Sequence, residues 1–318
     1  MTTTAARNPR AEASAVAGRP ARVLEPSPPA LQNEPWFADD PTALDGDPDA
    51  VTPTRVGAVT WADLARSDPA LADFARDHWL ANHKDLPAIP DGYAPSRDDY
   101  HRLAYAVIAN ARKAANGKIG LRYTHGGFGT PFFGDDEQVR VEGTDLVVQR
   151  GASVERTPIT TLAAAAAFDA TVADDSQAEH DTVALGDLDR VLDIRADVGR
   201  FLGDWFGFGT AVLEDARLLG TAPDDDVSRV QIWPGHFDPA VEIGSMDAGR
   251  RATYGASPGD GTHEGPYLYV AAWGDIDRNA DPFWNDTNFN GGSISYAELR
   301  TAADPRSAAA EFFFRAYE

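Results

Sequence analysis

The chain has 318 residues, 43% of them hydrophobic, which is enough to bury one large core or two small ones. Its formal net charge of -22 argues against a nucleic acid or an anionic membrane surface as a partner, because both bind basic faces. The complete absence of cysteine excludes disulfides, thiolate nucleophiles and thiolate metal sites.

The N-terminal residues 1–55 are rich in proline and alanine and predict a disordered tail outside the fold. Arginines near the start give this tail some likeness to an organellar transit peptide, but it has no amphipathic apolar stripe. It also lacks the apolar centre of a secretory signal, and no run in the chain approaches the roughly 18 apolar residues of a membrane span. We therefore expect a cytoplasmic protein.

Residues 56–175 predict a first half made of helices and antiparallel strands. Apolar residues recur every three or four positions from Asp98 to Ala115, and Asn116-Gly117 then favours a helix end. The other elements expected here are helices from Thr60 and over 71–80, strands over 119–123, 139–141 and 146–149, and an alanine-rich helix from Thr160 or Thr161 to Val172.

A polar, acidic stretch at 176–187 predicts a linker, and residues 188–318 predict a second half of the same kind. Its expected elements are a helix over 188–218, strands over 229–233, 240–243, 251–254, 267–273 and 293–296, and a final helix over 305–317. The predicted fold class is α+β, with two helix-flanked antiparallel β halves. Because both halves run helix, strands, helix, an ancient duplication is a further hypothesis, although their residues do not align.

Three glycines in the long predicted helix, Gly199, Gly203 and Gly207, are spaced four apart and share one face. Each costs about 1 kcal/mol relative to alanine in a helix interior, so something must approach that face closely. A tightly packed helix or strand explains the pattern better than a ligand lying in the groove.

Polar and aromatic residues interrupt the predicted strands between 230 and 273, as expected for a binding site at strand ends. The motif W-P-G-H-F-D supplies His236 and Asp238, which would point to the same face of an extended segment because Phe237 separates them. We interpret them as the catalytic pair, with His236 as general acid/base and Asp238 orienting it. Two metal ligands, or a structural histidine bonded to the turn backbone, are the alternatives.

Further residues are expected to bind the substrate. Arg122 and His125, beside flexible glycines, would meet an anionic group of the ligand, although an internal salt bridge from Arg122 to Asp135, Asp136 or Glu137 explains the arginine more simply. The remaining expected substrate contacts are Ser257 and Asp260 on a glycine- and proline-rich turn, and the aromatic walls Trp233, Tyr254 and Tyr267.

No metal site is assigned from the sequence. Every second residue is polar in Asp275, Asp277, Asn279 and Asp281, as in a calcium loop, but Ala280 occupies the position that requires glycine, and the preceding pattern is a strand. The chain contains no G-x-S-x-G elbow, no H-E-x-x-H helix and no phosphate-loop lysine, so a standard serine hydrolase, zincin or nucleotidase is not expected, and no cofactor is assigned.

Five motifs together resemble a known family. They are K-I-G-L-R-Y from Lys118, T-P-F-F-G-D-D-E from Thr130, W-P-G-H-F-D from Trp233, G-A-S-P-G-D from Gly255 and P-Y-L-Y-V from Pro266. In this order they are similar to the bacterial, largely actinobacterial, domain-of-unknown-function family 5996. The resemblance spans about 100–317, leaves the N-terminal tail outside, and implies no particular activity.

These patterns favour a small-molecule enzyme that uses His236 and Asp238 for acid/base chemistry in a polar and aromatic pocket. One alternative is a metal-dependent enzyme that binds its ion through His236, Asp238 and His125. The other is a non-catalytic ligand-binding or assembly protein. A small-molecule ligand is the only partner that the sequence favours.

Overall fold

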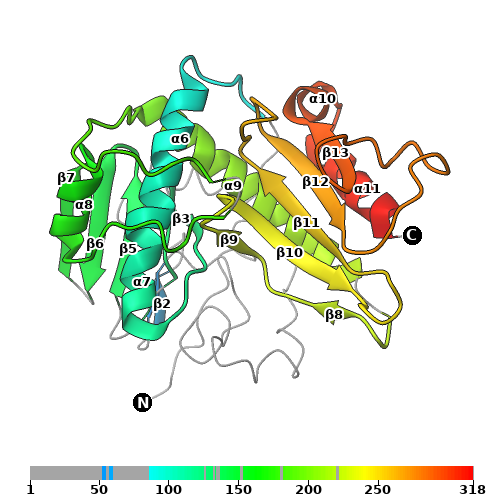
Figure 1. Cartoon of the computed structure of the whole chain (residues 1–318), viewed down its shortest axis with the longest axis horizontal. Helices are drawn as coiled ribbons and strands as arrows, with labels where there is room; N and C mark the ends of the chain where they lie inside the picture. Colours follow the sequence, from blue (N-terminus) through cyan, green and yellow to red (C-terminus); the bar gives the residue numbers. More distant parts are fainter. Residues whose placement is uncertain are drawn as a thin grey trace.

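The computed structural model describes residues 52–54, 57–59, 86–124, 127–131, 133, 137–150, 153–179, 182–219 and 222–317. The predicted helices from Thr60 and over 71–80, and the predicted tail up to residue 51, lie outside these residues. The described part begins with an antiparallel pair, β1 (Thr52–Thr54) and β2 (Gly57–Val59). The rest is an α+β fold in which helices surround two larger antiparallel sheets (Figure 1).

A helical rod opens the first half. It consists of α6 (Tyr93–Leu103), the π-helical turn η2 (Ala104–Ile108) and α7 (Ala109–Asn116). The helix thus starts before the predicted Asp98, after Gly92 in the left-handed conformation (φ 70°). It ends as predicted, since Gly117 adopts a φ of 77° and bonds back to Lys113.

The first sheet has the strand order β3-β4-β5-β6-β7. Its strands are β3 (Arg122–Thr124), β4 (Gly127–Gly129), β5 (Glu137–Glu142), β6 (Asp145–Arg150) and β7 (Ser153–Pro158). Val139 and Val141 are fully buried, in keeping with the predicted alternation. The sequence missed β4, which is mostly glycine, and β7, which is a polar and exposed edge strand. α8 (Leu162–Asp169) follows, capped by the Thr161 hydroxyl.

The second sheet has the order β13-β12-β11-β10-β8, with β9 also paired to β10. Its strands are β8 (Asp226–Val227), β9 (Gln231–Trp233), β10 (Asp238–Gly244), β11 (Ala252–Ser257), β12 (Tyr267–Ala272) and β13 (Gly291–Ser295). A backbone bridge between Leu121 and Ile232 connects this sheet to the first one. α10 (Tyr296–Thr301) and α11 (Pro305–Tyr317) close the chain, and α11 keeps its predicted bounds.

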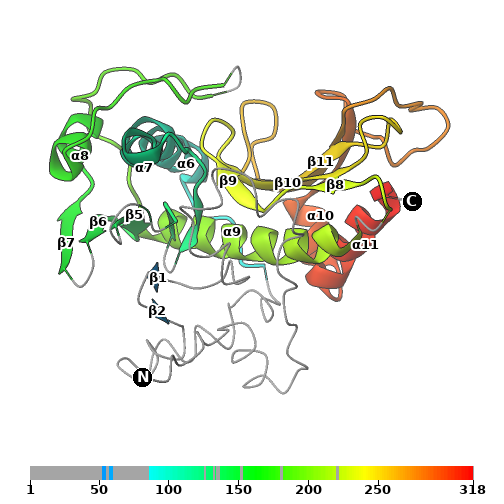
Figure 2. The same ribbon diagram turned by 90° about the horizontal axis from the view of Figure 1, so that it is seen from below.

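The long helix α9 (Ala196–Ala216) lies beneath the second sheet and reaches the first sheet with its N-terminal end (Figure 2). It packs against β3 and β4 of the first sheet and against β10 and β11 of the second, so the buried apolar residues form one continuous core. The prediction of a helix from residue 188 is wrong for 188–195, because this segment is bonded to α6 instead. Arg190 and the backbone N–H of Asp193 both donate to the carboxylate of Asp99.

Two glycines of α9 let neighbouring elements approach the helix closely. A Cβ on Gly199 would lie 2.6 Å from the Tyr100 hydroxyl of α6, and one on Gly207 would lie 3.3 Å from the Tyr123 ring of β3. Protein side chains, not a ligand, therefore occupy this face. In the part of the chain that the structure describes, no helix has both the length and the apolar character needed to cross a bilayer.

Candidate functional site

The second sheet has two different faces. Its lower face lies on the helices, where Tyr254 packs its ring edge against Phe313 of α11 and Ala256 approaches Gly209 of α9. Strand residues alternate between faces, so Asp238 and Ser257 belong to the opposite side, which we call the outer face (upper in Figure 2).

The turn that leads into β10 is held in an unusual conformation. Phe237 has a φ of 60°, in the left-handed region that non-glycine residues rarely adopt. Its ring is fully buried and contacts the rings of Phe128 at 4.9 Å and Phe206 at 5.1 Å. This packing compensates the backbone strain. His236 is exposed while Asp238 is buried, and residues 234–237 form a turn, so the expectation of an extended segment is wrong.

His101, on α6, supports the same turn from the first half of the chain. Its Nε2 lies 3.0 Å from the carbonyl oxygen of Pro234 and 3.1 Å from that of Gly235, and its ring stacks on Phe237. Burial lowers the pKa of His101 to about 4, so the ring is neutral and Nε2 carries the proton that the carbonyls accept. The sequence contains no signal that connects this histidine with a turn so distant along the chain.

Asp238 is the most unusual carboxyl group of the outer face. Asp238 is only 2% exposed, and its Oδ2 accepts a hydrogen bond from the Tyr269 hydroxyl. Among the residues that the structure describes, no group donates to its Oδ1. Burial raises the pKa of Asp238, although the charge of His236 and the Tyr269 hydrogen bond act in the opposite direction.

A glycine allows Tyr269 to reach this carboxyl group. Tyr269 lies on β12 and Asp238 on β10, with Gly255 of β11 between them. A Cβ on Gly255 would lie 2.3 Å from atoms of the Tyr269 ring, so the ring can cross β11 only where no side chain is present. Tyr269 was not predicted, although its position two residues after Tyr267 places both on one face.

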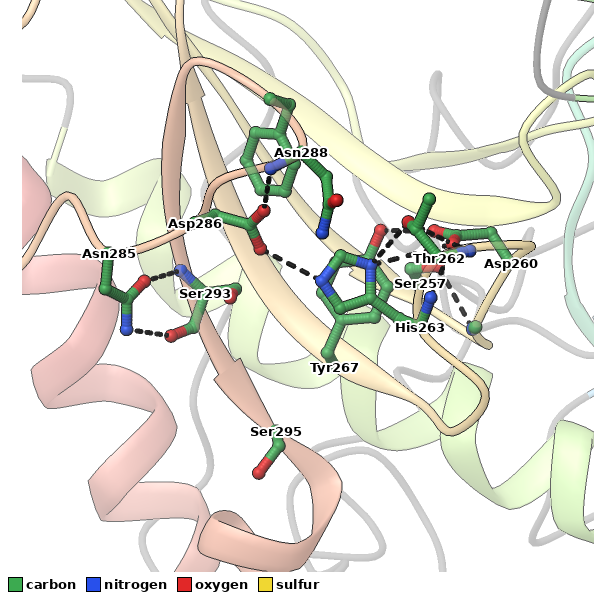
Figure 3. Close-up of polar contacts among 12 residues, drawn as sticks. Ser257, Asp260, Thr262, His263, Tyr267, Asn285, Asp286, Asn288, Ser293 and Ser295 are labelled. Atoms are coloured by element: carbon green, nitrogen blue, oxygen red, sulfur yellow. Dashed lines mark hydrogen bonds and ion pairs between the residues drawn. The ribbon is translucent and has the colours of Figure 1, made fainter.

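Asp260 forms a second polar group on the same side (Figure 3). It accepts hydrogen bonds from the Tyr267 hydroxyl at 2.7 Å, the Thr262 hydroxyl at 2.7 Å, and the backbone N–H groups of Thr262 at 2.6 Å and His263 at 2.8 Å. Burial alone would raise the pKa of Asp260, but these hydrogen bonds outweigh it and lower the pKa. Asp260 therefore stays ionised and holds Tyr267 in place.

His263 joins this group to the loop before β13. Its Nε2 lies 3.0 Å from Oδ2 of Asp286, and its ring stacks on Tyr267 with 4.1 Å between centroids (Figure 3). The Asp286 side chain is only 2% exposed, and its other oxygen accepts from the Asn288 backbone. Neither His263 nor Asp286 was predicted as a site residue, because only the tertiary structure brings their two loops together.

The structure separates the predicted site residues into two sets. Those on or beside the outer face are His236, Asp238, Ser257, Asp260 and Tyr267, with Trp233 at the start of the turn, where its carbonyl accepts from the Phe237 N–H. Tyr254 lies on the opposite face, against α11. Arg122 lies on β3 of the other sheet and donates to the carbonyl of Tyr123, and His125 lies outside the described residues.

The described residues contain no group of three or more His, Asp or Glu side chains arranged to hold a metal ion. Comparison of the chain with protein-family models, with curated proteins and with solved structures found no match. The resemblance to family 5996 therefore stays a prediction from the five motifs, and the candidate site rests on its own geometry.

Proposed function

We propose that the protein is an enzyme that acts on a small molecule by acid–base chemistry at the outer face, with Asp238 as the proton-carrying group. The observation that carries this proposal is a buried carboxyl group with one oxygen held by Tyr269 and the other without a donor among the residues that the structure describes. A protonated carboxyl group donates from its free oxygen. Oδ1 of Asp238 would thus give its proton to an acceptor atom of the ligand, and take it back at the end of the reaction.

The two carboxyl groups of the outer face support a division of roles. Burial raises the pKa of Asp238, whereas hydrogen bonds lower that of Asp260 in spite of its own burial. Such a separation of pKa values is typical of sites in which one carboxyl group acts as an acid and another stays ionised. We assign proton transfer to Asp238 and the orientation of Tyr267 to Asp260.

His236 takes a different role from the one that the sequence favoured. It is exposed on the turn, and its charge acts on Asp238. We assign it the exchange of protons between Asp238 and the solvent, which requires access to water. Ser257 and Tyr267, which pair directly across β11 and β12, would contact the ligand, with Trp233 at the edge of the site.

The test compares the wild-type protein with Asp238→Asn, which keeps the shape of the side chain and removes its acid. Each protein is incubated with a metabolite extract, and mass spectrometry identifies compounds that change only when the wild type is present. We expect the conversion to slow by about 10²-fold or more in Asp238→Asn, as is usual for loss of a general acid, and to slow less in His236→Ala. Asp224→Asn, an exposed carboxylate, is the matched control.

Three results would contradict the proposal. Conversion that persists in Asp238→Asn would exclude this group as the acid. Unfolding of His236→Ala would show that the histidine is structural. An extract that the wild type leaves unchanged would favour a non-catalytic binding protein.

A further inference from the structure

We propose that residues 259–265 form a strap that closes over the Tyr267 side of the site, and that the His263–Asp286 pair is its latch. This inference rests on the proposed function in one respect, because it describes how a ligand gains access to that same outer face. The strap connects β11 to β12, and Asp286 belongs to the separate loop before β13 (Figure 3).

The strap and the second loop together cover two tyrosines of the site. The His263 ring lies over Tyr267, with 4.1 Å between centroids and an interplanar angle of 27°. Phe289, from the second loop, packs edge-on against Tyr269 at 5.8 Å. Beneath this cover, Tyr267 is only 8% exposed and Ser257 only 5%. A ligand can reach these side chains only if the two loops separate.

The internal bonds of the strap allow it to move as one unit. Asp260 bonds to the N–H groups of Thr262 and His263, and its own N–H donates to the His263 carbonyl. At the start of the strap, Gly259 has a φ of 97°, where other residues would be strained. A compact segment that turns about such a glycine can swing without losing these internal contacts.

The His263–Asp286 pair is the contact that joins the two loops. The strap is also attached by the Tyr267–Asp260 hydrogen bond, by Arg97, which donates to the Glu264 carbonyl, and by the Gly259 N–H, which donates to the Ser257 hydroxyl. These contacts lead to β12, α6 and β11, and not to the second loop. Asp286 is buried, so loss of His263 would leave a desolvated carboxylate without one of its donors. The pair therefore holds the loops together more strongly than its single bond indicates.

The absence of cysteine permits a test that needs no ligand. Ser257→Cys places a single thiol beneath the strap, and its rate of alkylation by iodoacetamide reports how often the strap opens. Ser245→Cys is the matched control, because Ser245 is equally buried, at 4% exposure, but lies just after the far end of β10. Each thiol is introduced into the wild type, His263→Ala, Asp286→Ala and the double variant.

We expect alkylation of Cys at position 257 to accelerate about tenfold or more when either partner of the latch is removed, with no change at position 245. The double variant should react no faster than the single ones, because the two residues form one contact. His263→Phe keeps a ring to stack on Tyr267 and loses the bond to Asp286. It replaces His263→Ala in the alkylation experiment if the alanine variant does not fold.

The proposal is overturned by unchanged rates at position 257, by equal acceleration at both positions, or by additive effects in the double variant. None of these rates depends on catalysis. If the alkylation rates contradict the latch, the proposed role of Asp238 is still decided by the Asp238→Asn experiment. If that experiment contradicts the role of Asp238, the alkylation rates still decide whether His263 and Asp286 hold the strap closed.

Discussion

Asp169 is a buried carboxyl group far from the site, and its pKa shows the effect of burial on a single residue. Its side chain is 1% exposed at the end of α8, and no group of the described chain donates a hydrogen bond to either oxygen. Burial, assisted by the charge of Glu137, raises the pKa of Asp169 to about 7, while Arg150 at 3.7 Å opposes the shift only in part. Burial raises the pKa of Asp238 for the same reason, but Asp238 differs from Asp169 in accepting a directed hydrogen bond, from Tyr269.

Asp169→Asn should change how stability depends on pH. A carboxyl group with a raised pKa in the folded state contributes stability that is fully present below its unfolded pKa, near 3.8, and is lost as the pH rises through about 7. Asparagine cannot ionise, so the variant avoids this loss. We expect its advantage over the wild type in unfolding free energy to grow by on the order of 2–3 kcal/mol between pH 5 and pH 8.

Urea unfolding of both proteins at the two pH values measures this difference. Other titrating groups act equally on both proteins and cancel in the comparison. Parallel pH profiles would show that Asp169 reaches water and keeps an ordinary pKa.

At the scale of elements, three neighbouring strands cooperate to build the site. β10 supplies Asp238 and β12 supplies Tyr269. Between them, Gly255 of β11 has no side chain and so leaves space for the Tyr269 ring. The turn before β10 is equally specific, because the buried Phe237 ring fixes a left-handed residue between an exposed His236 and a buried Asp238. Register and strain, more than residue type, thus determine which groups meet.

Gly255→Ala should displace the Tyr269 ring and break its bond to Asp238. We expect a loss of about 1–3 kcal/mol in unfolding free energy, as for other substitutions that overfill a packed site. In a Tyr269→Ala background, the same substitution should cost far less, because the clash is gone. Gly261→Ala, which meets nothing within 4 Å, is the control.

Denaturant unfolding of the four proteins gives the coupling between positions 255 and 269. An equal cost of Gly255→Ala in both backgrounds would mean that the glycine serves the backbone of β11 and does not make room for the tyrosine.

For the whole molecule, α9 is the element that both halves share. It packs against β3 and β4 as well as β10 and β11, and the buried apolar residues form one core. His101 adds a polar connection, since it reaches from α6 to the turn that carries His236. The site thus depends on the first half of the chain, although most of its residues lie in the second.

We therefore expect the two halves to unfold in a single transition. Far-ultraviolet circular dichroism and tryptophan fluorescence should give the same midpoint in urea. Two separate transitions would instead support a division of the chain at the linker predicted for 176–187.

Local sequence patterns were sufficient for the α+β class, the helix end at Gly117 and the bounds of α11. Hydrophobic periodicity and turn residues act over a few neighbouring positions, so they can be recognised in the sequence alone. It could not show that 188–195 bonds to Asp99 instead of forming a helix, since those partners are far apart in the chain.

The tertiary structure alone decided which polar groups meet. Strand register brings Tyr269 to Asp238 across Gly255, and loop packing brings His263 to Asp286. Because side chains alternate between the two faces of a strand, Tyr254 points toward α11 and away from Trp233 and Tyr267, the other predicted aromatic walls of the site. Such pairings depend on distances between segments that are remote in sequence, and those distances are fixed only when the shared core around α9 is packed.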